Sequence, residues 1–333
     1  MTKVNRIFGM ELSPFSIKVR SYFRYKRIPH QWIVRNANST AEYAKYAKLQ
    51  IVPLVVTPEG EGVQDSTPII ERFEAAHPEP SILPPDPAAR FAAIVLEEFG
   101  DEWGNKWMFH LRWAREVDQI STSRRLAYGM MTAAAKPEMA EQMATQLRNR
   151  MVPRVSFVGS NPVTAPLIEK SFREGLALLD AHFQNRPYLF GGRPSFADFA
   201  LWGQLYNAWL DPTGFAWITA HSTALQDWVH RMINPMDEGE FEAWSSLSET
   251  LAPLMADQVG ALFLPWTAAN TAAMGAGEEE FTVELKGDEW TQKAGKYQVK
   301  SFRALRDKYA ALEERAAVDE MLRSTGCLEY LQA

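Results

Sequence analysis

Apolar and polar positions alternate in short blocks over the first 80 residues, and the period changes from block to block. Strand-like apolar runs lie at 5–10, 31–35, 53–57 and 61–65. Stretches with apolar residues at helical spacing lie at 15–27, 68–76 and, more weakly, 41–49. A period of two indicates a strand and a period near 3.6 indicates a helix, so the order is β-α-β followed by β-β-α. This α/β alternation predicts a small sheet with helices packed on it.

Residues 78–87, PEPSILPPDP, separate this region from one with a different pattern. Prolines remove backbone donors and disfavour helix, so the segment is predicted to be an extended connector. Beyond it the spacing is helical, with one apolar stripe formed by Ile168, Phe172, Leu176, Leu179 and Phe183. Ser195, with Asp198 three residues later, forms a capping-box pattern before another apolar helix. The sequence thus predicts an α/β domain over 1–80 and an all-helical domain over 88–235.

The pattern changes again from about residue 236 onward. Residues 281–285 look like a strand, and the run 300–322 has helical spacing. The apolar stretch 251–266 is interrupted by polar residues and is shorter than the ~20 residues of a membrane span, so it predicts a buried helix. Large apolar side chains continue through this tail at Trp244, Leu251, Leu254, Phe263, Trp266 and Trp290. Because they are too apolar to leave in water, we expect residues 236–333 to form an extension packed on the helical domain.

Composition narrows the classes of function. The 333 residues are 46% hydrophobic and 23% charged, with a formal net charge of −6, which is typical of a globular protein and argues against a nucleic-acid binder. Cys327 is the single cysteine, which excludes internal disulfides and cysteine-based zinc sites, and the histidines lack metal-ligand spacing. The N-terminus has no signal-peptide pattern. We therefore expect a cytoplasmic protein with no metal, no nucleic acid and no membrane partner.

Short segments at three element boundaries carry candidate chemistry. Ser13 precedes a proline at a strand-to-helix junction, where serine caps the helix, and capping alone is favoured on this pattern. The same helix start also offers free N–H groups and partial positive charge to a thiolate or carboxylate. Val52-Pro53 precedes a strand, and the pattern alone favours an ordinary trans bond. Asp65 and Ser66 open another helix, where serine again can be only a cap.

These segments, in this order, resemble the glutathione transferase family. The segment SPFSIKVR (13–20) is similar to a tau and omega class signature, with serine in place of cysteine, and VPLVV (52–56) is similar to the cis-proline segment. QDSTPII (64–70) resembles the start of a family helix, and RPSFADFAL (193–201) resembles the capping box of the family's helical domain. The resemblance covers residues 4 to about 235 and implies a thioredoxin-like domain followed by an all-α domain. It leaves the tail as an appended segment.

The resemblance implies glutathione as co-substrate, with its thiol near Ser13, whose hydroxyl stabilises the thiolate. Glutathione contacts are implied for Phe15, Gln50, Val52, Pro53, Asp65 and Ser66. The backbone of Val52, before a cis proline, pairs with the cysteinyl part as a short strand addition. Asp65 and Ser66 take the γ-glutamyl end at a helix start. Whether Ser13 or Ser16 carries the important hydroxyl stays open.

The helix that flanks the electrophile pocket in this family corresponds to 101–113. An aromatic stripe there contains Trp103, Trp107, Met108, Phe109 and Trp113. The resemblance implies Trp103, Trp107 and His110 as pocket residues. An aromatic stripe at helical spacing is more often a packed core, and a lone histidine is more often structural.

The resemblance predicts a glutathione transferase-like enzyme of the kind that acts in detoxification. In such an enzyme the glutathione thiolate attacks a small hydrophobic electrophile. The resemblance also implies a homodimer paired through residues 88–235. A serine at position 13 disfavours thiol–disulfide exchange, which needs sulfur. Two alternatives stay open: a glutathione-dependent lyase or isomerase, and a non-catalytic, metaxin-like scaffold whose tail is the functional part. The sequence does not identify the electrophile.

Overall fold

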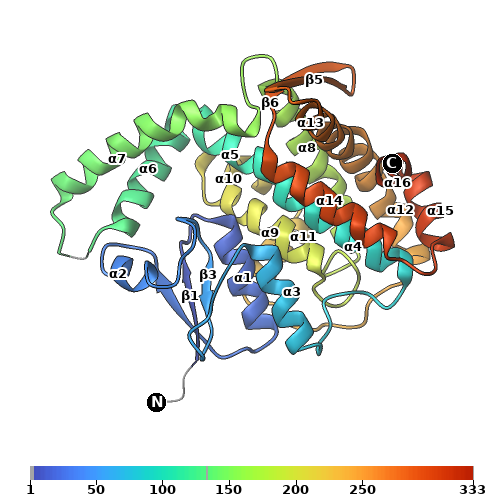
Figure 1. Ribbon diagram of the computed structural model, residues 1–333, viewed down its shortest axis with the longest axis horizontal. Helices are drawn as coiled ribbons and strands as arrows, with labels where there is room; N and C mark the ends of the chain where they lie inside the picture. The colour runs from blue at the N-terminus through green and yellow to red at the C-terminus, as the bar shows by residue number, and fades with distance from the viewer. Residues whose placement is uncertain (1–3, 133, 333) are drawn as a thin grey trace.

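A computed structural model describes residues 4–132 and 134–332, and its N-terminal domain is built on a mixed sheet (Figure 1). The strands are β1 (Asn5–Gly9), β2 (His30–Val34), β3 (Leu54–Val56) and β4 (Gly62–Gln64). Their order is β2-β1-β3-β4, with β1 parallel to β2 and antiparallel to β3, and with β3 antiparallel to β4. The turn between β3 and β4 contains Gly60 with φ 89°, a left-handed conformation that suits glycine. The expected hairpin is therefore confirmed.

Helices cover both faces of this sheet. They are α1 (Pro14–Tyr25), α2 (Thr40–Tyr43) and α3 (Ser66–Ala76). Side chains alternate between the faces of a strand, so neighbouring residues enter different cores. Ile7 and Val55 belong to the large core that contains α1 and α3, whereas Phe8 packs with Tyr43 of α2. The N-terminal domain is thus an α/β layer structure of the thioredoxin-like type.

The helix expected over 41–49 is shorter in the structure and ends at Tyr43. Turns follow, in which the backbone N–H groups of Tyr46 and Ala47 both donate to the Tyr43 carbonyl at 3.1 Å. The side-chain oxygen of Gln64 then accepts the backbone N–H groups of Lys48 and Leu49 at 2.8 and 2.9 Å, and its amide nitrogen donates to the Leu49 carbonyl at 2.8 Å. Residues 48 and 49 are thus tied to β4 and take no part in a helix.

The next part of the chain is helical, after the extended proline-rich connector. Its α-helices are α4 (Pro87–Phe99), α5 (Asn105–Ala114), α6 (Glu116–Met130), α7 (Pro137–Met151), α8 (Ala165–Phe183), α9 (Phe196–Trp209), α10 (Pro212–Thr219) and α11 (Thr223–Arg231). The π-helical turn η1 (Gly100–Gly104) joins α4 to α5, and the 3-10 helix η2 (Val152–Val158) follows α7. Helices α6 and α7 pack together and project as an arm on the same side as α2 (Figure 1).

Helix α9 is buried at the centre of the helical domain. Its capping box is formed as expected: the backbone N–H of Ser195 donates to Asp198 at 2.8 Å, and the backbone N–H of Asp198 donates to the Ser195 hydroxyl. Helix α9 packs against α1 and α4. A Cβ added at Gly203 would lie 2.8 Å from the Pro14 carbonyl oxygen. Glycine therefore lets α9 approach the start of α1 closely.

The C-terminal extension adds helices and a hairpin. It contains α12 (Trp244–Leu254), the π-helical segment η3 (Met255–Phe263), α13 (Leu264–Ala276), β5 (Glu280–Leu285), β6 (Asp288–Lys293), α14 (Lys296–Ala310), α15 (Ala316–Ser324) and α16 (Leu328–Gln332). Helix α12 packs against α8, while α14 and α15 pack against α4. One hydrophobic cluster joins the core residues of all three parts of the chain. No helix among the described residues is long and apolar enough to cross a membrane.

The helical run expected over 300–322 is interrupted after Ala310. The side chain of Arg315 donates to the carbonyl oxygens of Ala310 and Leu312, at 2.6 and 3.1 Å. Since these carbonyls are bonded by a side chain instead of by the following turn, the chain leaves the helix here and starts α15 in a new direction.

Candidate functional site

All three parts of the chain meet around a cavity of about 630 Å³. Its walls come from the start of α1, the segment before β3, the start of α3, η1, the helices α5, α6 and α7, and the first turn of α14. A concave site between domains is the usual place for a small-molecule ligand.

Ser13 lies on the cavity wall as the N-cap of α1. Its backbone is extended, with φ −112° and ψ 111°, and its hydroxyl accepts the backbone N–H of Ser16 at 3.3 Å. Pro14 follows at the first helical position, where no N–H is needed. The side chain of Ser16 is fully buried, and its hydroxyl has no hydrogen-bond partner among the described residues. Of the two serines, Ser13 is therefore the one that lines the cavity.

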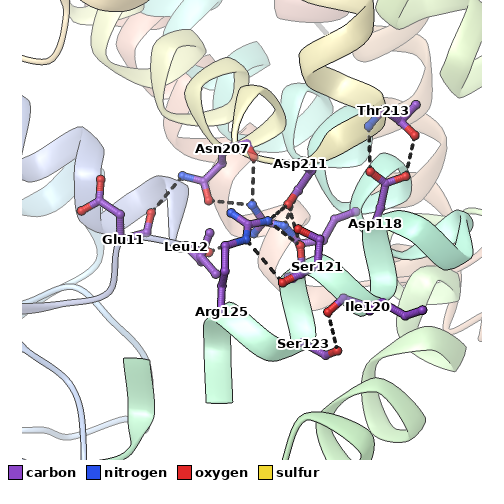
Figure 2. A network of polar contacts seen from close by, with 12 residues as sticks. Glu11, Leu12, Asp118, Ile120, Ser121, Ser123, Arg125, Asn207, Asp211 and Thr213 are labelled. Atoms are coloured by element: carbon purple, nitrogen blue, oxygen red, sulfur yellow. Dashed lines mark hydrogen bonds and ion pairs between the residues drawn. The ribbon is translucent and has the colours of Figure 1, made fainter. Parts of the chain in front are cut away.

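The loop before Ser13 is held from the helical domain. Arg112 of α5, which is 4% exposed, donates to the Leu12 carbonyl at 2.9 Å. Its other nitrogens donate to Asp211 at 2.7 Å and to the backbone and side-chain oxygens of Asn207 at 3.0 and 2.9 Å. Figure 2 shows Leu12, Asn207 and Asp211 gathered in this network. Buried, charge-assisted hydrogen bonds therefore fix the position of the Ser13 loop.

The segment before β3 supplies a second wall, where Gln50, Val52 and Pro53 line the cavity. The Val52–Pro53 peptide bond is cis, as the family resemblance implies, although the local pattern alone favours trans. The Tyr43 hydroxyl contacts the carbonyl oxygens of Leu49 and Ile51, at 2.8 and 2.6 Å, on the approach to this bond. The Tyr43 side chain thus fixes the backbone next to Val52.

Asp65 and Ser66 form the third wall, at the start of α3. Asp65 has φ 79°, a left-handed conformation that is uncommon for a residue with a side chain. Ser66 is buried, and its hydroxyl lies 3.3 Å from a carboxylate oxygen of Asp101. The hydroxyl of Tyr297, from α14, lies 3.3 Å from a carboxylate oxygen of Asp65. Residues far apart in the sequence therefore meet at this end of the cavity.

A buried ion-pair network underlies the same end. The ammonium of Lys18 donates to Glu97 at 2.5 Å and to Asp101 at 2.6 Å. Burial alone lowers the pKa of Lys18, but the charges of Asp101 and Glu97 outweigh it and raise that pKa above its usual range. Burial raises the pKa of Asp101 to about 6, and burial with the Asp101 charge raises that of Glu102 to about 7. This end of the cavity is polar and acidic, which suits an ammonium group.

The opposite half of the cavity is apolar. Its lining includes Leu12, Phe15, Met108, Phe109, Trp113, Leu126 and Met151. Helices α5, α6 and α7 supply most of these side chains, so the projecting arm helps to close the apolar half. The cavity can therefore accommodate a peptide-like polar group at one end and an apolar molecule at the other.

Trp103, Trp107 and His110 do not line the cavity, which corrects the expectation that they are pocket residues. They are 0%, 1% and 2% exposed. Both indole N–H groups donate to the Ser171 hydroxyl, at 2.9 and 2.8 Å, and a ring nitrogen of His110 lies 3.1 Å from Glu169. Burial lowers the pKa of His110, although Glu169 raises it. These side chains pack α5 against α8, because the most apolar face of the helix turns to the core.

Several cavity residues were not singled out from the sequence: Asp101, Glu102, Asn105, Arg112, Tyr297 and Gln298. The residues of this group between 101 and 112 recur at helical spacing, on the helix face opposite Trp103 and Trp107. This polar stripe is visible in the sequence and could have indicated them. No local signal marks Tyr297 and Gln298, because their position depends on where α14 packs.

Two family models match this chain. The glutathione S-transferase N-terminal domain matches residues 7–81, and the glutathione S-transferase C-terminal domain matches residues 140–231. With the thioredoxin-like sheet and the helical domain described above, these matches place the protein in a family: the chain belongs to the glutathione transferase superfamily. The extension lies outside both matched ranges. No curated protein matches the sequence significantly.

Solved structures are similar at low identity. A glutathione S-transferase from Methylobacterium radiotolerans, in complex with glutathione sulfonate, is 18% identical over 74% of this chain and 93% of its own, with a TM-score of 0.41. A tau class enzyme from mango is 17% identical over 76% and 100%, with a TM-score of 0.43. Beta-etherase LigF from Sphingobium sp. is 19% identical over 70% and 95%, with a TM-score of 0.49. These similarities are too distant to carry an activity or a substrate to this chain.

Proposed function

We propose that this protein is an enzyme that binds glutathione in the polar half of the cavity and joins it to a small hydrophobic electrophile in the apolar half. One observation carries the proposal. Ser13, the cis Val52–Pro53 bond and the Asp65–Ser66 helix start line one cavity, which continues into an apolar half. The family of the chain makes a glutathione-binding site the expectation for this cavity.

Each wall has a defined task in this proposal. The γ-glutamyl carboxylate binds at the start of α3, where Ser66 and free backbone N–H groups favour an anion. The γ-glutamyl ammonium faces Asp65. The cysteinyl backbone pairs with that of Val52 beside Pro53, because an extended ligand adds to a strand edge. Gln50 completes the glutathione site, together with Phe15, which the proposal shares between the polar and the apolar half of the cavity.

The reaction needs a thiolate near Ser13. A free thiol has a pKa near ~8.5, and each unit of depression corresponds to ~1.36 kcal/mol of thiolate stabilisation. One hydrogen bond to a charged group supplies ~1.5–3 kcal/mol, and the N-terminus of α1 assists. The thiol proton goes to solvent, the sulfur forms a bond to the electrophilic carbon, and the leaving group departs with its electron pair. Ser13 is the catalytic residue in this proposal.

We further propose a cytoplasmic homodimer, and the structure limits how two chains can pair. Elements of the extension pack against α4 and α8, so these contact faces are not free for pairing. The arm of α6 and α7 presents Tyr128 and Met139, which are 55% and 53% exposed. Light scattering at micromolar concentration is expected to report twice the 37.7 kDa of one chain. A single species of 37.7 kDa would contradict the dimer and leave the glutathione site unaffected.

The experiment for the proposed enzyme compares two serines on the first turn of α1. We expect Ser13→Ala to lower turnover with a general aromatic electrophile about tenfold to a hundredfold, while costing about 1 kcal/mol of folding free energy for the lost cap. Ser16→Ala is the matched control, since the Ser16 hydroxyl is buried away from the cavity and lacks a partner among the described residues. Steady-state rates and chemical denaturation measure both effects. If the wild type binds glutathione but shows no turnover, or if Ser13→Ala is as active as the wild type, the proposed mechanism is wrong.

A further inference from the structure

Helix α14 of the extension lies across the junction of the first two domains. Figure 1 shows it running beside α4 and above α3. The ammonium of Lys308 pairs with Glu71 of α3 at 2.6 Å, and the Ser301 hydroxyl bonds to Glu98 of α4. Both domains therefore hold α14, which places its first turn at the acidic end of the cavity.

Two side chains of that first turn reach acidic residues on the cavity wall. The Tyr297 hydroxyl lies 3.3 and 3.5 Å from the two carboxylate oxygens of Asp65. The Gln298 amide nitrogen lies 3.3 Å from a carboxylate oxygen of Glu102. All four residues line the cavity. The extension thus contacts both the α3 start and η1 at the place where the γ-glutamyl end is proposed to bind.

We infer that Tyr297 positions the Asp65 carboxylate to receive the ammonium group of a γ-glutamyl ligand, so that the C-terminal extension is part of the glutathione site. The inference rests on the proposed function, because it assigns a task to residues of the same cavity. It makes Tyr297 a positioning residue: the hydroxyl acts through Asp65 and does not take part in the chemistry at sulfur.

The backbone of Asp65 supports this assignment. A left-handed conformation at a residue with a side chain is unfavourable and persists where the surroundings hold it, often at ligand sites. The conformation, with φ 79°, places Asp65 on the cavity wall at the N-cap of α3, although its side chain makes no capping hydrogen bond. The carboxylate contacts Tyr297 instead. A single hydroxyl can orient the carboxylate and leave acceptor positions for a ligand.

The charges around the Tyr297 hydroxyl decide which of the two groups donates the proton. Burial raises the pKa of Tyr297, and the charges of Asp65, Glu102 and Asp101 raise it further. The hydroxyl therefore stays protonated and donates to Asp65. Asp101 at the same end is paired with Lys18, and Glu102 carries negative charge above its pKa of about 7, where it favours a cation such as a primary ammonium.

The test is a binding cycle with two ligands on the full-length protein. Calorimetric titration with glutathione compares the wild type, Tyr297→Phe, Asp65→Asn and the double variant. We expect Tyr297→Phe to weaken glutathione about fivefold to tenfold, because one charge-assisted hydrogen bond is lost from a half-exposed site. The double variant should bind no more weakly than Asp65→Asn alone, since the hydroxyl acts through Asp65. Cysteinylglycine lacks the γ-glutamyl group, so its affinity should be the same in the wild type and Tyr297→Phe.

Turnover and a control complete the test. KM for glutathione should rise in Tyr297→Phe while kcat stays unchanged, as expected when binding alone is lost. Tyr46→Phe removes a hydroxyl from a tyrosine that does not line the cavity and should leave both parameters unchanged.

Each result has a defined meaning. Unchanged glutathione affinity in Tyr297→Phe overturns the inference, and so does an equal loss for glutathione and cysteinylglycine, which indicates a structural effect. Tighter glutathione binding also overturns it, because the tyrosine then occupies the ligand's place. If the wild type itself fails to bind glutathione, the proposed function falls and the inference falls with it, whereas a binding wild type with an unaffected variant removes the inference alone.

Discussion

The segment from Gly100 to Ala114 has two faces that are built in opposite ways. On one face, Trp103 and Trp107 are completely buried, and both indole N–H groups bond to Ser171 of α8. The other face presents acidic and polar side chains to the cavity at one end and apolar ones at the other. Trp103 and Trp107 therefore pack this segment against α8, whereas the residues of the opposite face, Trp113 among them, line the ligand site.

This difference shows how one helix serves stability and function separately. The core face joins α8 and the extension, since the Trp103 ring packs at 5.9 Å from Trp266 and at 5.5 Å from Trp290, measured between ring centroids. The cavity face instead fixes the loop before Ser13 through Arg112. Substitutions on the two faces should therefore have different effects, the first on folding and the second on ligands.

The largest expected effect comes from comparing Trp107→Ala with Phe109→Ala. We expect Trp107→Ala to lower the free energy of unfolding by about 3–5 kcal/mol, because it leaves a cavity in a packed core and removes one of the two indole donors to Ser171. Phe109, two residues later on the cavity wall, is only half-buried. Phe109→Ala should cost about 1 kcal/mol or less and raise KM for an apolar electrophile. Urea denaturation and steady-state kinetics on both variants check this pair.

An equal loss of folding free energy in Trp107→Ala and Phe109→Ala would contradict the division of the helix into a core face and a cavity face. So would a Trp107→Ala variant that kept wild-type stability and changed only the KM for the electrophile, because Trp107 would then behave as a pocket residue.

A smaller effect concerns Lys106, a charge on the core face. Its ammonium lies 3.6 Å from the centroid of the Trp266 ring and donates to the Val158 carbonyl at 3.0 Å. Burial lowers its pKa from 10.5 to about 7. Between these values the unfolded chain binds the proton more tightly than the folded protein does, so Lys106 makes stability rise with pH from about 7 to about 10.

Lys106→Met is expected to remove that rise. Relative to the wild type, the variant should lose up to about 2 kcal/mol of stability between pH 7 and pH 9, because one proton contributes at most ~1.36 kcal/mol per pH unit. Urea denaturation at pH 7, 8 and 9 measures the difference, with Lys300→Met as an exposed control. Curves for Lys106→Met and the wild type that stay parallel across this range would show that the buried ammonium has no depressed pKa.

Much of the fold follows from local pattern. Serine or proline marks the starts of α1 and α3, and the turn at Gly60 sets the β3–β4 hairpin, because each feature depends on neighbouring residues. The course of residues 48 and 49 did not follow from the local pattern, since their backbone groups bond to the side chain of Gln64 on another strand. The interruption after α14 did not follow from the local pattern either, because the side chain of Arg315 bonds the carbonyl groups there.

The candidate site divides in the same way. Ser13, Asp65 and Ser66 are carried by short motifs at helix starts, so the sequence places them on the cavity wall. Which face of α5 lines the cavity depends on how α8 and the extension pack against this helix. The sequence pattern of one helix does not contain that information. The position of Tyr297 depends on the contacts that α14 makes with the two other domains. No residue near Tyr297 in the sequence indicates those contacts.

The central claim is that the start of α1 activates a glutathione thiol through Ser13. The most direct measurement is a pH titration of the bound thiol, followed by its ultraviolet thiolate absorbance, in the wild type, Ser13→Ala and Ser16→Ala. We predict a pKa about two units below the ~8.5 of a free thiol in the wild type and in Ser16→Ala, and a return upward by at least about one unit in Ser13→Ala. The same thiol pKa in all three proteins would contradict the claim.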